Sequence, residues 1–561
     1  MSIKFKYILP MILAAGLIGS CSKSTFDINT DPNNPATLPA KNLLPRIEKN
    51  MGDVNSMSGI GSVLEVYMHR VSVREAPNAY GVTGNSGYVD GDIWDPYYSS
   101  LITNANIIID KSTAAGNFKY SGIAKVIKAY AFSQLVDVFG DVPYTEATKL
   151  TDGNLNPKFD DDATIYPSLL ALLDQAIADL NNTAINASSP GADDVIYGGV
   201  VSKWVKAANT IKLKLYTQER RVANVTAAVT ALLASPATLI ASTADNFQVP
   251  YSTTNQNPGY GDYGAAQRTQ YTSPWFYETM MGYRPEVFTG IQDPRIPYYW
   301  FNQLKPGQTT TNDGFATEYR DGPFLSIYFG SNGPNSGFAQ QNSLTVLGIY
   351  PVGGKYDDKS GSGYSTATKL NAASASGAAP VRLITYADRL FLEAELIQSN
   401  VITGDARAKL QAAITEAMKQ VDAVVTKTGT PGVPVLAGSA NATAYITAIM
   451  SYYDANPSKA LQIIMTQKWI SSFGSAVDAY TDYRRTGFPV IWDPNSPIMA
   501  PGGFVQPPIH GNPLVDPQLP VKVSANRDFP LSLPWPSDEL SSNSNAPVQK
   551  TPSTYKVFWQ P

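Results

Sequence analysis

Residues 121–147 read SGIAKVIKAYAFSQLVDVFGDVPYTEA, and this stretch decides the fold. Its apolar side chains recur with the 3.6-residue period of an α-helix and form one stripe. The stripe consists of Ile123, Val126, Ile127, Tyr130, Ala131, Leu135 and Val138. Gly140 and Pro143 are expected to end the helix, since glycine accepts a left-handed cap and proline cannot continue the hydrogen-bond ladder. A helix with such a stripe must be buried against a partner.

The nearest partner lies upstream, in residues 92–110, whose large side chains also follow a helical spacing. A short polar loop joins the two segments, which predicts an antiparallel helical hairpin. Three more pairs share this pattern: residues 167–180 with 200–216, 384–398 with 405–421, and 442–453 with 458–483. The spacing of Trp94, Tyr97 and Leu101 resembles the first helix of a tetratricopeptide repeat. The chain is therefore predicted to be mainly α, with four tetratricopeptide-like hairpins that form a scaffold for long loops.

The composition narrows the class of protein. The chain has 561 residues, of which 43% are hydrophobic and 16% charged, and it carries 32 Tyr. Its net charge is −4 and the sequence contains no basic run, so nucleic-acid binding has little support. A single Cys excludes an internal disulfide framework and a cysteine-based metal cluster.

The N-terminus has the pattern of an export signal. Lys4 and Lys6 precede an apolar run, and small residues stand directly before the only cysteine, Cys21. This arrangement resembles the lipobox of bacterial lipoproteins, which predicts a signal peptide over residues 1–20, acylation of Cys21 and a flexible tether over residues 21–41. The alternative is an ordinary secretory signal with a chance cysteine. An acylated chain is held on a membrane rather than in it.

Residues 249–380 have no long period of either kind and are rich in Gly, Asn, Ser, Thr and Tyr. Aromatic rings in or beside loops can stack on the apolar face of a sugar or pack on a peptide side chain. The candidate ligand-binding residues are Tyr80, Tyr88, Trp275, Tyr277, Tyr298, Trp300 and Tyr328. The alternative for each is that the loop packs onto the scaffold. Trp94, Trp204 and Trp469 fall on helix stripes and are expected in the core.

We find no catalytic motif in this sequence. The chain has two histidines and lacks the zincin, nucleophile-elbow, Walker A and dinucleotide patterns. Residues 152–156 alternate like a Ca²⁺ loop, but Pro157 stands where the turn glycine belongs. Residues 160–162 are three aspartates directly before a helix, where dipole and capping roles explain them better than catalysis. We expect no catalytic residue, no metal and no cofactor.

Several stretches together resemble the SusD/RagB family, especially its nutrient-binding outer-membrane lipoproteins. The resemblance covers nearly the whole chain. The residues that carry it are INTDPNNP (28–35), Trp94-Asp95 with Asn104 and Asn106, VDVFGDVPYTEA (136–147), Asp293-Pro294-Arg295, Thr385-Tyr386-Ala387-Asp388, Gln467-Lys468-Trp469, YRRTGFP (483–489) and Trp535-Pro536-Ser537-Asp538-Glu539. Most of these motifs also have a structural explanation, with Arg484 and Arg485 placed to bridge helices.

The resemblance implies one SusD-like domain over residues 42–561. Its helical scaffold would comprise residues 42–248 and 381–488, its ligand-side lobe residues 249–380, and its C-terminal wrapping tail residues 489–561. It also implies a lipid anchor on the outer membrane, facing the cell surface, and a SusC-like TonB-dependent transporter as partner. The first acidic residue after Cys21 is Asp27. Family members often carry Asp or Glu closer to the acylated cysteine, and this feature is associated with surface export.

Four functions remain open at this stage. The first is capture of oligosaccharides without catalysis, and the second is capture of peptides, as in the RagB type. The third is a hydrolase that uses a carboxylate pair. The fourth is a purely structural partner of the transporter.

Overall fold

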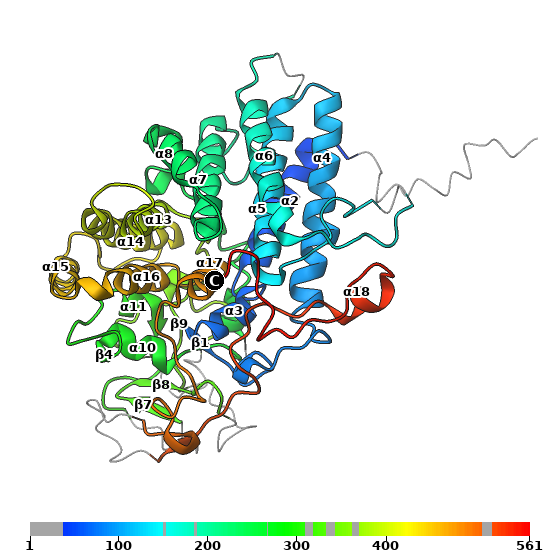
Figure 1. Cartoon of the computed structure of the whole chain (residues 1–561). Coiled ribbons are helices and arrows are strands. Elements are labelled where there is room, and N and C mark those ends of the chain that lie inside the picture. Colours follow the sequence, from blue (N-terminus) through cyan, green and yellow to red (C-terminus); the bar gives the residue numbers. More distant parts are fainter. Residues whose placement is uncertain are drawn as a thin grey trace, which may run out of the picture.

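The computed structural model describes residues 38–149, 153–184, 188–265, 268–308, 318–331, 343–361, 370–507 and 519–561. Cys21, the signal peptide predicted over residues 1–20 and Asp152 lie outside these residues. The chain is mainly helical, with helices stacked side by side along an arc and short strands gathered near one end (Figure 1). The prediction of a mainly α fold is confirmed. No helix in the described part of the chain is long and apolar enough to cross a membrane.

The first two predicted hairpins form one side of the arc. α4 (Thr103–Ala114) packs against α5 (Phe118–Phe139), α5 against α6 (Asp162–Asn181), and α6 against α7 (Val201–Glu219) (Figure 1). Two π-helical turns, residues 90–94 and 96–102, precede α4, so the upstream helix is less regular than its spacing predicts. α2 (Ala40–Asn55) packs across α4 and α5.

The other two pairs form the opposite side. α13 (Tyr386–Gln398) packs along α14 (Ala406–Thr428), and α15 (Ala440–Ala455) packs on α14. The segment predicted as one helix over 458–483 is divided into α16 (Ala460–Ser471) and α17 (Ala476–Thr486). Gly474 lies in the break with φ +91°, a conformation that favours glycine and interrupts a helix.

The remaining elements are short and connect or cover these helices. The helices are α3 (Gly61–Tyr67), α8 (Thr226–Leu233), α9 (Tyr260–Gly264), α10 (Pro274–Met281), α11 (Ile296–Tyr299), α12 (Ile349–Val352) and α18 (Ser537–Ser542). The strands are β1 (Val71–Ser72), β2 (Phe247–Val249), β3 (Tyr271–Thr272), β4 (Tyr283–Arg284), β5 (Phe288–Thr289), β6 (Trp300–Phe301), β7 (Tyr319–Asp321), β8 (Phe324–Ser326), β9 (Val346–Leu347), β10 (Val381–Ile384), β11 (Phe504–Val505) and β12 (Val521–Lys522). In the described residues these strands pair two by two, all antiparallel: β1 with β3, β2 with β10, β4 with β5, β6 with β9, β7 with β8, and β11 with β12.

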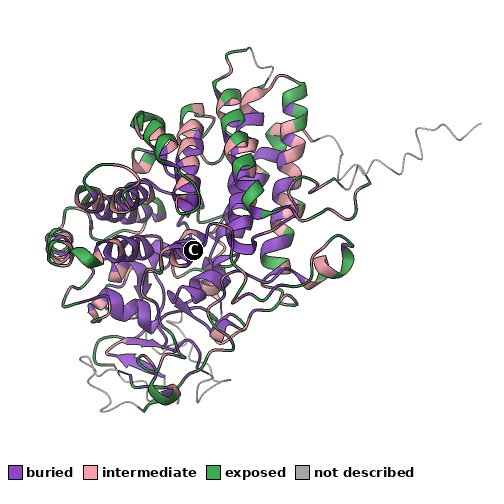
Figure 2. Ribbon diagram, viewed as in Figure 1, coloured by how far each residue is buried: buried purple, intermediate pink, exposed green. Residues whose placement is uncertain are grey.

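One large core runs through scaffold and loop region alike, as the continuous purple of Figure 2 shows. Trp94, Trp204 and Trp469 are buried in it, which confirms their predicted core role. The C-terminal segment returns to the end of α5, where Leu533 N–H donates to the carbonyl of Val138 at 2.8 Å. Trp535 Nε1 donates to the carbonyl of Asp141 at 2.9 Å. The C-terminal segment is therefore attached to residues 138–141, within the stretch that decides the fold.

The two arginines of the YRRTGFP motif bridge helices, as expected. Arg485 on α17 donates with both terminal nitrogens to the carboxylate of Glu395 on α13. Arg484 donates to the backbone carbonyl of Asp137 on α5. All three side chains are buried, so these contacts join helices that are distant in sequence.

Candidate functional site

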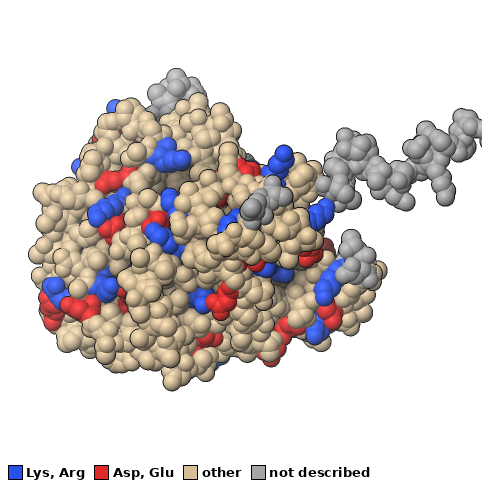
Figure 3. Space-filling model, turned by 90° about the horizontal axis from the view of Figure 1, so that it is seen from above, with Lys and Arg blue, Asp and Glu red and all other residues tan. Residues whose placement is uncertain are grey.

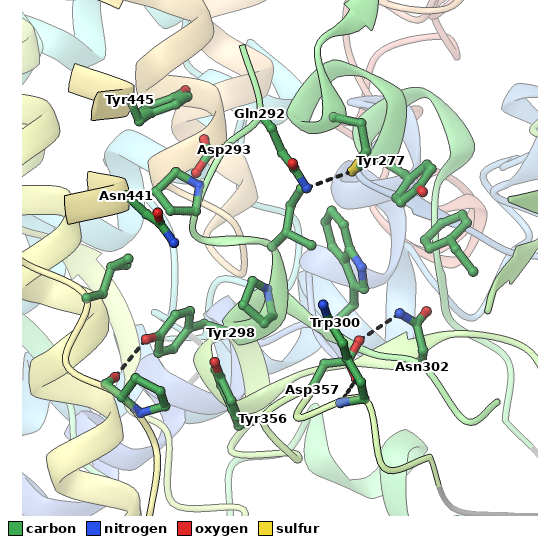
Figure 4. A pocket seen from close by; sticks show the side chains of 18 of the residues that line it. Tyr277, Gln292, Asp293, Tyr298, Trp300, Asn302, Tyr356, Asp357, Asn441 and Tyr445 are labelled. Atoms are coloured by element: carbon green, nitrogen blue, oxygen red, sulfur yellow. Dashed lines mark hydrogen bonds between the residues drawn. The ribbon is translucent and has the colours of Figure 1, made fainter. Parts of the chain in front are cut away.

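A cavity of about 870 Å³ opens between α10, α11, α15 and the β7–β8 hairpin. This volume lies within the range of sites that bind small molecules. The lining residues used below are Tyr277, Gln292, Asp293, Tyr298, Trp300, Asn302, Asp321, Phe324, Tyr356, Asp357, Lys359, Val435, Asn441 and Tyr445 (Figure 4). The wall thus combines aromatic rings with amide and carboxylate groups.

Tyr298 and Tyr356 form an aromatic corner in this wall. Their ring centroids lie 4.9 Å apart and the rings are inclined by 64°, close to an edge-to-face pair. Tyr298 is fixed because its hydroxyl donates to the carbonyl of Pro434 at 2.7 Å. Tyr356 is only half-buried, so part of its ring remains accessible to a ligand.

Two further buried rings line the cavity. Trp300 on β6 is 0% exposed, and its indole N–H has no hydrogen-bond partner in the described residues. Tyr277 on α10 stacks on Phe324 with centroids 3.7 Å apart. Its hydroxyl donates to Asp321 Oδ2 at 2.6 Å, and burial, followed by the charge of Asp321, holds the pKa of Tyr277 well above its ordinary value. Both rings belong to the cavity wall.

Polar groups surround the aromatic corner. Asn302 Nδ2 donates to Asp357 Oδ2 at 2.7 Å, and the backbone N–H of Lys359 donates to Asp357 Oδ1 at 3.0 Å. Burial raises the pKa of Asp357 against the opposing effect of these hydrogen bonds. Gln292 and Asn441 are exposed at the rim, with Asn441 and Asn302 on opposite sides of the view in Figure 4.

The α15 side of the rim is held in place by local hydrogen bonds. The Ser439 hydroxyl caps α15 by accepting from the N–H of Ala442 at 3.2 Å, which fixes Asn441 in the first turn. Before the cap, the N–H groups of Leu436 and Ala437 donate to Asp422 on α14 at 2.7 and 2.9 Å. The rim therefore rests on two scaffold helices.

Asp293 belongs to the motif Asp293-Pro294-Arg295 and forms a buried ion pair. Its Oδ2 lies 2.6 Å from Arg295 Nη2, and its Oδ1 accepts from Arg295 Nε at 2.9 Å. The same Nη2 donates to Gln467 Oε1 at 3.1 Å, so two motifs quoted from the sequence meet behind the cavity. This pair positions the loop that carries Gln292.

The structure brings together three of the seven predicted binding residues, Tyr277, Tyr298 and Trp300, in the cavity wall. It places the other four elsewhere. Tyr80 is buried with its hydroxyl 3.0 Å from His69 Nε2, and Trp275 donates its indole N–H to the carbonyl of Val490 at 3.1 Å. Tyr328 is buried, and Tyr88 is half-buried beside the core.

Sequence reasoning missed the polar residues of the wall and the whole contribution of residues 434–448. Asn441 stands in the first turn of a scaffold helix, outside the ring-rich strip 249–380. Tyr356 is a further aromatic residue of that strip, and aromatic composition could have identified it. In the described residues, no group of three His, Cys, Asp or Glu side chains is placed to hold a metal ion.

Charged side chains of both signs are mixed on the face seen in Figure 3. Lysines and arginines lie among aspartates and glutamates there and do not gather in one patch. Elsewhere in the described residues several charges are paired, as between Lys212 and Asp174 at 2.5 Å. The cavity is the candidate site because aromatic and polar side chains come together in it.

Solved structures with the same fold share little sequence with this chain. A SusD homologue from Bacteroides fragilis NCTC 9343 is 19% identical with a TM-score of 0.64, covering 93% of this chain and 99% of its own. A SusD/RagB family protein from Bacteroides thetaiotaomicron is 22% identical with a TM-score of 0.63, over 93% and 99%. A chitin-binding SusD homologue from Flavobacterium johnsoniae is 19% identical with a TM-score of 0.61, over 93% and 98%.

No curated protein matches the chain. The model of the SusD-like family, described as starch-binding and associating with the outer membrane, matches residues 32–505. The match spans the four hairpins, the cavity and nearly every motif quoted above. This chain therefore belongs to the SusD-like family of outer-membrane nutrient-binding proteins.

Proposed function

We propose that this protein captures oligosaccharides without transforming them and delivers them to a TonB-dependent transporter of the SusC type. The observation that carries the proposal is the cavity, which combines the Tyr298–Tyr356 corner with amide groups of Asn302, Gln292 and Asn441. A pyranose ring needs an aromatic face for its C–H groups and hydrogen-bonding groups for its hydroxyls. The cavity offers both kinds of group side by side.

The geometry suits a ligand of a few sugar units. The volume of about 870 Å³ exceeds what one ring requires. The rim also carries Val435, an aliphatic side chain 72% exposed, against which a second ring can rest. With two or three aromatic contacts of ~0.5–1.5 kcal/mol each, we expect dissociation constants of roughly millimolar to micromolar.

The cavity carboxylates have positions that favour binding over catalysis. Asp293 is held by Arg295, Asp321 accepts from Tyr277, and Asp357 accepts from Asn302. Each carboxylate is thus oriented by a protein donor, as expected of a wall that presents fixed acceptors. We infer a binding role for them, and product analysis after incubation with the bound glycan tests it.

The anchor and the partner are parts of the same proposal. Residues 1–20 would be removed, Cys21 acylated, and residues 21–41 would tether the domain to the outer membrane, facing the cell surface. The description of the family as starch-binding and associating with the outer membrane supports capture of glycans there, as do solved relatives described as chitin-binding. Uptake through a barrel partner follows from the family resemblance.

Glycan titration of wild-type protein and matched variants tests the proposal. Starch, chitin and cellulose oligosaccharides would be titrated calorimetrically, and the protein should bind at least one of these series. Tyr356→Ala and Asn302→Ala should weaken that binding about ten-fold, which corresponds to about 1.4 kcal/mol. Tyr88→Ala, at a predicted residue outside the cavity, is the control and should leave binding unchanged.

Three results would contradict the proposal. If Tyr88→Ala abolished binding while Tyr356→Ala did not, capture would occur on another surface. If no glycan bound and peptides did, the peptide-capturing alternative would replace it. Full binding in both Tyr356→Ala and Asn302→Ala would exclude the cavity as the site.

A further inference from the structure

The described residues that line the cavity carry an uneven set of charges. Three are carboxylates, Asp293, Asp321 and Asp357, and one, Lys359 at the exposed rim, is a cation. No arginine lines the cavity in the described part of the chain. Asp293 and Asp357 differ in how far the protein neutralises them, and that difference affects the charge that a ligand meets.

Asp293 is neutralised within the protein. Arg295 lies behind it and reaches both of its oxygens, with Nη2 2.6 Å from Oδ2 and Nε 2.9 Å from Oδ1. Both side chains are buried, so the pair is strong and persistent. Asp293 therefore contributes an oriented dipole rather than a net charge.

Asp357 is not neutralised in this way. Its hydrogen bonds come from the side chain and backbone of Asn302 and the backbone N–H of Lys359, all of which are uncharged donors. None of the salt bridges between described residues includes Asp357. Burial raises the pKa of this carboxyl, while these hydrogen bonds lower it.

Asp321 is a further carboxylate of the lining. It is buried, and its Oδ2 accepts from the phenol of Tyr277 at 2.6 Å. The charge of Asp321 in turn contributes to the raised pKa of Tyr277, after burial. The selection by charge rests on Asp357 alone, in a cavity where charge interacts more strongly than in water.

Trp300 is a buried residue of the same lining. It is 0% exposed, and its indole N–H has no hydrogen-bond partner in the described residues. An unmet buried donor costs free energy until an acceptor satisfies it. The hydrogen bond that selection by charge requires is a different one, from the amine of a bound sugar to Asp357.

We propose that the cavity selects its glycan by charge, binding oligosaccharides with protonated amino sugars more tightly than their neutral counterparts and rejecting uronic acids. This inference rests on the proposed function and specifies its ligand class. A protonated amine forms a charge-assisted hydrogen bond with Asp357, whereas a ligand carboxylate would be repelled by Asp357, and the cation of the described lining, Lys359, lies at the exposed rim.

Matched tetrasaccharides of glucosamine, N-acetylglucosamine and galacturonic acid test the proposal by calorimetric titration, at a pH where the amine is protonated. The glucosamine series should bind about ten-fold more tightly than the acetylated series, and the galacturonate series should not bind measurably. The preference should shrink as salt is added. Equal affinity for the amino and acetylated series, or binding of the galacturonate series, would overturn the charge selection.

Asp357→Asn should remove most of the preference for glucosamine, because the amide carries no charge to pair with the amine. The acetylated series is titrated against the same variant, and the preference is the ratio of the two affinities. Asp174→Asn changes the net charge equally, at an exposed position on α6, and should leave the preference intact. Asn441→Lys adds a cation at the exposed rim without disturbing buried packing. This variant tests charge selection even if Asp357→Asn does not fold. It should weaken glucosamine binding, and an unchanged preference in it would overturn the proposal.

Failure of this inference is distinguishable from failure of glycan capture. If the acetylated or other neutral series bind, and the charge of the sugar does not change the affinity, glycan capture is supported and charge selection is wrong. If no sugar of any charge binds, the proposed function itself falls. If lysine-rich peptides bind and amino sugars do not, the carboxylates serve a peptide site and the amino-sugar assignment is wrong.

Discussion

Gly140, which ends α5, lies directly against the ring of Tyr555, 415 residues later in the chain. A Cβ built on Gly140 would stand 2.5 Å from Cε1 of that ring. The backbone of Gly140 has φ +75° and ψ −121°, so it occupies a region open to glycine but is not in the left-handed helical conformation that its position predicts. Next to it, Asp141 N–H donates to the Tyr555 hydroxyl at 3.3 Å.

Gly140→Ala should therefore destabilise the protein by about 3 kcal/mol, because the strained backbone and the overlap with Tyr555 add. Guanidinium unfolding followed by circular dichroism measures the change. Gly91→Ala is the control, because an added Cβ there meets nothing within 4 Å and alanine is the better helix former. Equal stability of the two variants would show that the tail does not hold Gly140 in this conformation.

A second prediction concerns two buried carboxyl groups, Glu48 on α2 and Asp194. Burial and the neighbouring charge of Asp194 hold the pKa of Glu48 well above its ordinary value. The folded protein thus keeps a proton that the unfolded chain has lost, so the free energy of unfolding falls as pH rises above about 4.5. Glu48→Gln removes this loss, and its stability relative to wild type should rise by up to about 1.4 kcal/mol per pH unit within that window.

Asp194→Asn serves as the contrasting variant. Its carboxylate accepts from the N–H groups of Ile196, Tyr197 and Gly199 and from Trp204 Nε1 at 2.7–3.1 Å. An amide nitrogen in place of one oxygen leaves some of these donors unpaired, so the variant should lose about 1–3 kcal/mol. Stability curves of wild type and both variants against pH give the answer. Parallel curves for Glu48→Gln and wild type would show that Glu48 does not keep a proton in the folded protein above the pH at which the unfolded chain loses it.

A third prediction concerns the buried bridge between Arg485 and Glu395. Glu395 is reached by both terminal nitrogens of Arg485 and by Arg220 at 2.8 Å. Arg485→Met removes one cation from a buried carboxylate and should cost about 3–5 kcal/mol of unfolding free energy. Arg485→Lys keeps the charge but loses the two-pronged geometry, so it should cost less. Equal losses in the two variants would show that charge is not what the bridge supplies.

The scaffold could be predicted from the sequence because the apolar side chains that packed helices bury recur with the period of a helix. The stripe from Ile123 to Val138 requires a partner wherever it occurs, and the structure supplies that partner in α4 and α6. The division of residues 458–483 was missed, since the apolar pattern continues through the break at Gly474. Local conformations such as the π-helical turns before α4 leave no comparable pattern.

The candidate site was predictable only in part. Aromatic composition identified Tyr277, Tyr298 and Trp300, but composition alone does not distinguish a ring on a cavity wall from one in the core, as Tyr80 and Trp275 show. Asn441 and Asp357 come together with these rings only through tertiary packing of α15 and the loop after α12. Their roles depend on neighbours that no sequence spacing encodes.

A crystal structure with a bound oligosaccharide, chosen from the titrations, tests the central claim most directly. The account predicts a sugar ring against Tyr356, with its hydroxyls within hydrogen-bond distance of Asn302, Gln292 or Asn441, inside the cavity of about 870 Å³. A sugar bound on another surface, beside Tyr88 for example, with the cavity unoccupied, would contradict it.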